Sequence, residues 1–400
     1  MTATPGPRLV LALASISLVG SLALHLFIPA IPVVKTALGL SDALAQLTFS
    51  IAVFSMAFST LVYGSFSDRY GRRPILLLGL GLFLIGSAFS AAADSALTLL
   101  IGRLVQAIGA GCGVTLARAI AQDVYGRADL VKAIAYLTMF YTIGPMISPL
   151  VGGFLIDSFG WRSVFVFALA VGTIITACAY ITVFESRPSV VVNRRGESVF
   201  RSYFGLFRHL RFTAFVLQTG FCTGSFLVTA TAASSLMKQI LYRPSSEFGI
   251  YFLVFPCGFL CGNLISSRIG SRIAEETMVF TGSLIAFAAV IVQSSLLLSG
   301  PVTPLSLFLP GFFITMAQGI SLPYAQAGAI STDSKLAGTA SGIGVFVSNL
   351  CGAAFAQLYG TLADGTPVPL VETTAISASL GLIVGLLPLL IQRRARPANF

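Results

Sequence analysis

Long apolar runs separated by short polar segments dominate the chain. A hydrocarbon core of about 30 Å is crossed by ~20 helical residues. By this length criterion we count twelve runs: 9–31, 44–66, 75–93, 96–120, 132–156, 162–184, 211–235, 247–267, 277–298, 303–327, 337–360 and 369–391. They are too long for barrel strands and alternate too little, whereas helices satisfy their own backbone groups in lipid. The pattern predicts an all-α integral membrane protein with twelve transmembrane helices.

Composition supports this class. Of the 400 residues, 56% are hydrophobic and 10% are charged, against about 45–50% apolar and about 25% charged residues in soluble domains. A net charge of +10 would suggest a nucleic-acid partner in a soluble protein, but here the basic residues lie in short loops, so we expect none. All six cysteines lie in apolar runs without metal-ligand spacing. We expect no metal and no cofactor.

Lysine and arginine are distributed unevenly over the loops. With both termini cytoplasmic, 18 of the 24 basic residues lie on the cytoplasmic side and four on the opposite side. Cytoplasmic loops carry the excess of Lys and Arg. We therefore predict a multi-pass protein whose two termini are cytoplasmic.

The chain divides into two similar halves. A basic hydrophilic segment, 185–210, separates an amino-terminal part, 1–184, from a carboxy-terminal part, 211–400. RYGRR at 69–73 recurs as RIGSR at 268–272, and the run ending in GGFLIDSFG at 160 corresponds to the run ending in GAAFAQLYG at 360. Such a repeat predicts two six-helix bundles related by an axis along the membrane normal, which is a transporter architecture.

The loop after the second run concentrates charge between apolar segments. It reads GSFSDRYGRR, and its candidate functional residues are Gly64, Asp68, Arg69, Gly71, Arg72 and Arg73. Asp68 can interact with the positive end of the following helix. The arginines can face cytoplasmic water and anionic headgroups, and the glycines allow a tight turn and close approach. Alternatively, the three arginines only fix the topology.

This loop matches the pattern G-x-x-x-D-R-x-G-R-R of the major facilitator superfamily. RLVQAIGAG at 103–111 resembles the fourth-helix motif of that superfamily, and GPMISPLVGG at 144–153 resembles its fifth-helix antiporter motif. LARAIAQDVYG, RPSSEFGIYF and AGTASG are similar to segments of the bicyclomycin/chloramphenicol-resistance (Bcr/CflA) branch of drug exporters. The resemblance implies a bacterial inner-membrane transporter that works by alternating access. It also implies that the charged loop latches the two bundles together on the cytoplasmic side.

The fifth run carries the residues expected of a hinge: Gly144, Pro145, Pro149, Gly152 and Gly153. Small residues let helices approach closely, and prolines free backbone carbonyls and bend the helix. A bending helix would suit a rocking motion. The alternative is a structural kink that takes no part in coupling.

Ionisable groups within the apolar runs are the sharpest functional candidates. All fourteen acids lie in loops or at the ends of runs, and His25 stands where the resemblance leads us to expect an aspartate. We expect His25 and Arg103 at similar depth on neighbouring walls of a central cavity. Arg103 then binds substrate or acts in gating, with Gln106 as one possible partner, or it holds helices together. His25 is the candidate proton carrier or an interface histidine. Arg118 is expected to pair with Asp123.

Further polar side chains are candidates for lining the cavity: Tyr141, Gln218, Tyr251, Gln318 and Asn349. We expect a monomer that exports drugs or small amphiphilic molecules in exchange for protons. The alternative is an importer or exchanger of a small anionic metabolite that uses Arg103, without carboxylate-based proton coupling. The chain has no phosphate-binding loop for ATP and no catalytic constellation within the runs, so we do not expect an enzyme.

Overall fold

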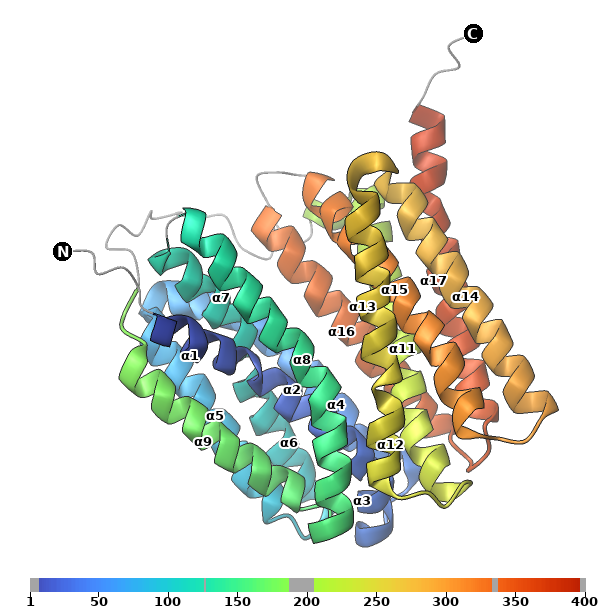
Figure 1. Cartoon of the computed structure of the whole chain (residues 1–400), viewed down its shortest axis with the longest axis horizontal. Helices are drawn as coiled ribbons and strands as arrows, with labels where there is room; N and C mark the ends of the chain where they lie inside the picture. The colour runs from blue at the N-terminus through green and yellow to red at the C-terminus, as the bar shows by residue number, and fades with distance from the viewer. Residues whose placement is uncertain (1–6, 126, 187–204, 333–336, 396–400) are drawn as a thin grey trace. The chain divides into compact units, whose positions relative to one another are not determined.

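The computed structural model describes residues 7–125, 127–186, 205–332 and 337–395. Its first half comprises α1 (Pro7–Ser17), α2 (Val19–Leu24), η1 (His25–Ala30), α3 (Ile31–Leu38), α4 (Asp42–Tyr70), α5 (Arg72–Ala91), α6 (Ala96–Ala110), α7 (Cys112–Val124), α8 (Arg127–Phe159) and α9 (Ser163–Thr182). The second comprises α11 (Leu210–Gln239), α12 (Ser245–Phe252), α13 (Val254–Ile269), η2 (Gly270–Arg272), α14 (Glu275–Ser299), α15 (Pro304–Thr332), α16 (Ala337–Leu362) and α17 (Val368–Ala395). Figure 1 follows this order by colour from blue to red.

Twelve helical stretches of the described residues are long and apolar enough to cross a membrane. They match the twelve runs predicted from hydropathy, and the described residues contain no strand. Large apolar side chains also cover outward faces: Phe58 is 56% exposed, Leu97 67% and Ile181 80%. A soluble monomer rarely exposes apolar surface on this scale. The predicted all-α membrane fold is confirmed.

The first span is interrupted in the middle. It runs from Arg8 to Leu38, longer than predicted, and its central part, η1, is a 3₁₀-helix that contains Pro29. Proline has no N–H group, so Pro29 and Pro32 remove two donors of a regular helix. The backbone tightens in response, and the N–H of Ile31 donates to the Ile28 carbonyl. The break lies next to His25, the first residue of η1.

The chain folds as two compact units. Unit 1 contains Met1–Asn193 and Arg243–Ile250, and unit 2 contains Arg194–Tyr242 and Tyr251–Phe400. The predicted linker, 185–210, is therefore shared between them, and its residues 187–204 lie outside the described part. Residues 243–250 belong to unit 1, although they follow α11 in the sequence. This placement differs from the predicted carboxy-terminal part, 211–400.

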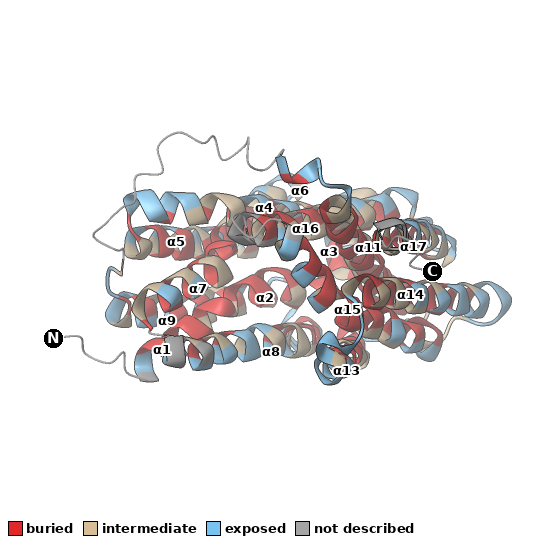
Figure 2. Ribbon diagram, turned by 90° about the horizontal axis from the view of Figure 1, so that it is seen from above, coloured by how far each residue is buried: buried red, intermediate tan, exposed pale blue. Residues whose placement is uncertain are grey.

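Buried residues lie where helices pack within each unit. In Figure 2, α2 is coloured as buried along its length, and every one of its residues is buried. In unit 1, α5 packs on α6 and α9, and η1 packs on α8. In unit 2, α14 and α13 pack on α15, and α11 packs on α16 and α17. Aromatic rings fill part of unit 2: Phe255 stacks on Phe308 with 5.2 Å between the ring centroids.

Candidate functional site

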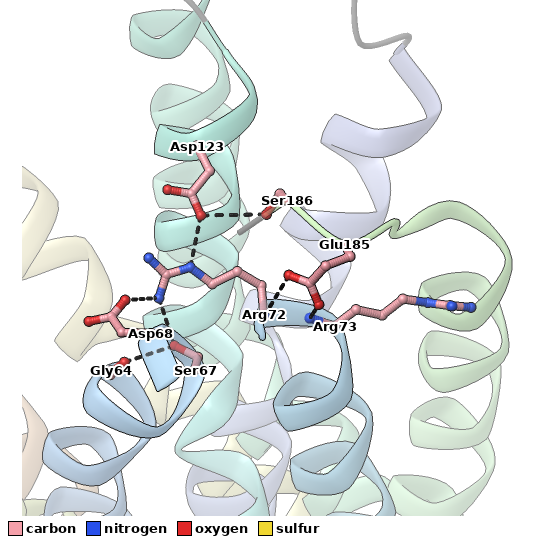
Figure 3. A network of polar contacts seen from close by, with 8 residues as sticks. All are labelled: Gly64, Ser67, Asp68, Arg72, Arg73, Asp123, Glu185 and Ser186. Carbon is pink, nitrogen blue, oxygen red and sulfur yellow. Dashed lines mark hydrogen bonds and ion pairs between the residues drawn. The ribbon is translucent and has the colours of Figure 1, made fainter. Parts of the chain in front are cut away.

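A cluster of charged residues surrounds the turn at Gly71 between α4 and α5 (Figure 3). We call Asp68, Arg72, Asp123 and Glu185 the loop cluster. Arg72 Nη1 lies 2.6 Å from Asp68 Oδ1, and Arg72 Nε donates to Asp123 Oδ2 at 2.8 Å. The Arg72 side chain is only 12% exposed. It therefore connects the end of α4 to the end of α7 through two acids.

Glu185, just beyond α9, caps the amino terminus of α5. Its Oε1 accepts a hydrogen bond from the backbone N–H of Arg72 at 2.9 Å, and its Oε2 accepts one from that of Arg73 at 3.2 Å. The first N–H groups of a helix have no partner within the helix, and they favour negative charge. We expected Asp68 as the acid that interacts with the start of α5. In the structure, Glu185 binds those N–H groups and Asp68 binds the Arg72 side chain.

The remaining loop residues have separate roles. Gly71 has a φ of +104°, and a Cβ there would lie 2.6 Å from Glu185 Oε2, so the turn and the cap both require glycine. At Gly64 a Cβ would meet nothing within 4 Å, so the structure gives no steric reason for glycine there. The guanidinium of Arg69 lies over the Tyr70 ring, and that of Arg73 lies over the Tyr180 ring.

Asp123 has a different partner from the one we predicted. It pairs with Arg72 and also accepts a hydrogen bond from Ser186 Oγ at 3.5 Å, whereas Arg118 is exposed on α7. Side chains on a helix meet when they are three or four residues apart. Arg118 and Asp123 are five apart and point away from each other, which explains the difference.

Arg103 is fully buried inside unit 1, with 0% exposure. Its Nη1 donates to the Ala23 carbonyl and to Gln106 Oε1, both at 2.6 Å, and its Nε donates to the Thr48 carbonyl at 3.1 Å. Its guanidinium carbon lies 4.4 Å from the centroid of the Phe27 ring. Among the described residues no carboxylate pairs with it. These are the contacts that the helix-packing interpretation requires.

His25 lies on a different face of the first span from the face that contacts Arg103 of α6. Ala23 and Phe27, one turn apart, contact Arg103. Ser21 faces Gly144 of α8, where a Cβ would overlap its hydroxyl. His25 is two residues from both Ala23 and Phe27, so its side chain points to another side of the helix. Its Nδ1 is buried and has no hydrogen-bond partner among the described residues.

The hinge residues predicted in the fifth run all lie within the single helix α8, which contains both Pro145 and Pro149. A Cβ at Gly152 would overlap the Leu26 carbonyl oxygen, and one at Gly153 would overlap the Ser245 carbonyl oxygen. The glycines therefore let α8 touch the backbone of η1 and of residues 243–250 within unit 1. Close contact is observed, and the bending of this helix stays a prediction.

The other cavity candidates are divided between the units. Tyr141 is 44% exposed on α8. Gln218 is fully buried in unit 2 and donates to Ser283 Oγ at 3.0 Å. Gln318 donates to Thr223 Oγ1 at 3.1 Å. Tyr251 stacks on Phe308, and Asn349 donates to the Val345 carbonyl of its own helix.

Two further groups of contacts were not foreseen from the sequence. Asp157, at the end of α8, accepts hydrogen bonds from the backbone N–H groups of Ser245 and Ser246 at 3.0 and 2.7 Å. In unit 2, Arg211 lies 2.8 Å from Glu276 and 3.1 Å from Glu275. These acids were recognisable only as charges at the ends of runs. Nothing in the sequence named their partners.

Comparison with known proteins agrees with this fold. The family model described as Major Facilitator Superfamily matches residues 13–356. The chain is 26% identical to Multidrug resistance protein D of Escherichia coli strain K12 over 385 residues, covering 96% of this chain and 94% of that protein. It is 23% identical to the Bicyclomycin resistance protein homolog of Haemophilus influenzae over 374 residues, covering 91% and 92%.

Solved structures show the same fold. An inward-facing, unoccupied bacterial homolog of the human lysosomal transporter Spinster superposes with a TM-score of 0.76 at 19% identity, covering 98% of this chain and 99% of that one. A mutant form of the nucleoside transporter NupG gives 0.77 at 13% identity, covering 96% and 99%. The family match spans most of the chain, and the twelve helices agree with it. This chain is a member of the Major Facilitator Superfamily and a multi-pass membrane transporter, not an enzyme.

Proposed function

We propose that this protein exports drugs or small amphiphilic molecules across a bacterial inner membrane by alternating access. One observation carries the proposal: the chain aligns over 96% of its length with Multidrug resistance protein D. Both termini are cytoplasmic in this proposal, because the basic loops then face the cytoplasm. The loop cluster lies on that side and forms the unit 1 part of the cytoplasmic latch.

Proton exchange is the proposed driving force, and His25 is the proposed carrier. Among the described residues, the only buried charged side chains are Arg103 and Glu276, and Glu276 lies at the start of α14. The other acids of the described part lie in loops or near the ends of helices, so its helices carry no carboxylate in the middle of the membrane. Histidine is the side chain whose charge changes most readily near neutral pH. Within the described part of the chain, His25 has a buried nitrogen without a partner, beside the break in the first span.

Proteoliposomes test the export proposal. Vesicles that are acidic inside should accumulate a labelled cationic drug more than vesicles at equal pH on both sides. Equal drug accumulation with and without the pH gradient would exclude proton exchange. Absence of any drug movement would exclude drug export. His25→Ala should abolish the response to the gradient, while Glu372→Ala, a change at an exposed acid on α17, should preserve it.

One observation favours a second function. Arg103 Nη2 has no hydrogen-bond partner among the described residues, and a guanidinium is suited to bind carboxylate or phosphate. In this alternative the protein imports or exchanges a small anionic metabolite, and Arg103 becomes accessible in another state. Arg103→Lys would then weaken transport of organic anions and spare neutral drugs. Equal effects on both classes of compound would exclude it.

A further inference from the structure

The amino terminus of α5 lacks a cap from its own segment. Its N-cap residue is Gly71, which has no side chain to accept a hydrogen bond. The partner comes instead from Glu185, more than a hundred residues later in the sequence, whose two oxygens bind the N–H groups of Arg72 and Arg73. The bare Cα of Gly71 makes room for that carboxylate. Capping of this helix and docking of the chain beyond α9 are therefore one interaction.

The capped residue is also the centre of the loop cluster. Figure 3 shows the Arg72 side chain extending between Asp68 and Asp123, while the Arg73 side chain points away from both. Besides the two acids, Arg72 Nη1 donates to Ser67 Oγ at 2.7 Å. These partners hold the guanidinium end of Arg72, and its backbone is the other end of the residue. Glu185 holds that backbone at its N–H group.

Arg73 provides a second attachment of the same chain segment. Its Nη2 donates to the carbonyl of Tyr180 at 3.0 Å, and its guanidinium lies 5.3 Å from the centroid of that ring. Cations at the carboxy-terminal end of a helix are favourable, and Tyr180 lies in the last turn of α9. Two contacts thus join the end of α9 to the start of α5. Glu185 beyond α9 binds the backbone of α5, and Arg73 of α5 binds the backbone of α9.

The docked residues begin the segment that leads out of unit 1. Ser186 Oγ donates a hydrogen bond to Asp123, and the first stretch of unit 1 ends at Asn193. We propose that Glu185 is the positioning residue of the loop cluster. By capping α5 it holds Arg72 between Asp68 and Asp123, and it ties the cluster to the start of the chain segment that connects the two units. The role in transport rests on the latch proposed above, whereas the positioning itself does not.

Hydrogen–deuterium exchange on the full-length protein tests the positioning without any substrate. Glu185→Ala should speed exchange of the amides of Arg72, Arg73 and Ile75 by about fivefold, the size of a lost helix cap, and should also speed exchange at the end of α7 around Asp123. Glu185→Gln, which keeps one acceptor oxygen, should restore part of the protection. Glu372→Ala should leave both regions unchanged. If the amides of Arg72 and Arg73 exchange in Glu185→Ala at the same rate as in the wild-type protein, the proposal is overturned.

A double-substitution series separates positioning from simple stabilisation. Arg72→Gln keeps the backbone N–H that Glu185 binds but removes the guanidinium. In that background, Glu185→Ala should still expose residues 72–75, but it should cause no further change around Asp123. Where drug transport is measurable, it should fall severalfold in Glu185→Ala alone and no further in the double variant. If Glu185→Ala speeds exchange around Asp123 equally in both backgrounds, positioning through Arg72 is overturned. A wild-type protein that transports no drug would overturn only the proposed function.

Discussion

The guanidinium of Arg103 lies 4.4 Å from the centroid of the Phe27 ring, inside unit 1. It also lies 5.8 Å from the centroid of the Phe165 ring on α9. A cation over an aromatic face contributes ~2 kcal/mol when water is excluded, and hydrogen bonds to charged groups contribute about 1.5–3 kcal/mol each. Aromatic faces and carbonyl oxygens therefore replace the carboxylate that a buried arginine usually finds.

Arg103→Ala should lower the midpoint of thermal unfolding in detergent by several degrees. The substitution removes the hydrogen bonds to the Ala23 and Thr48 carbonyls. It also leaves the buried Gln106 Oε1 without the donor that it has in the structure, and a buried acceptor without a partner costs about 1–3 kcal/mol. Arg8→Ala, at an exposed position near the start of α1, is the control and should have little effect. An Arg103→Ala protein with unchanged stability but no transport would instead favour the substrate or gating role.

Gly71→Ala should destabilise unit 1, while Gly64→Ala should not. At position 71 the new Cβ meets Glu185 Oε2 and the backbone has a positive φ, a strain of order 1–3 kcal/mol. At position 64 a Cβ has free space within α4, and alanine favours a helix by about 1 kcal/mol over glycine. Thermal unfolding of both variants gives the comparison. Reduced transport by Gly64→Ala at normal stability would support contact of this position in another state.

Asp157→Ala should release residues 243–250 from α8. The carboxylate accepts two backbone hydrogen bonds at the start of α12, and loss of a helix cap costs about 0.5–2 kcal/mol. Hydrogen exchange of residues 245–250 should accelerate. Glu247→Ala is the matched control, because the Glu247 pair with Arg243 is 3.6 Å long and its arginine is half exposed. Such pairs contribute about 0–1 kcal/mol. Equal exchange in both variants would contradict the assignment.

Arg211→Gln should destabilise unit 2, because it leaves the Glu276 carboxylate without its cation. The Glu276 side chain is 7% exposed, so removal of its cation leaves a buried charge that costs several kcal/mol. The further change Glu276→Gln should recover most of the lost stability, because it removes the charge that has no partner. Thermal unfolding of the single and double variants measures this. If the double variant is less stable than Arg211→Gln, the interpretation is wrong.

The amino-acid order alone determined the membrane class, the twelve spans and the family. These properties depend on local quantities: the hydropathy of about 20 consecutive residues and short motifs such as GSFSDRYGRR at 64–73. The ninth run, predicted at 277–298, corresponds to Glu275–Ser299. Asp68 and Arg72 were also predicted to matter as a group, because both belong to one short charged motif between two apolar runs.

Tertiary structure alone decided which polar groups meet. Arg72 contacts Asp123 and Glu185, 51 and 113 positions away, and no local pattern specifies such a pair. The same limit explains Arg103, whose partners are backbone carbonyls and rings that no sequence motif marks. It also explains His25, because the faces of the first span depend on how η1 packs against α8. Burial makes each polar group find a partner, but the packing of helices decides which partner it finds.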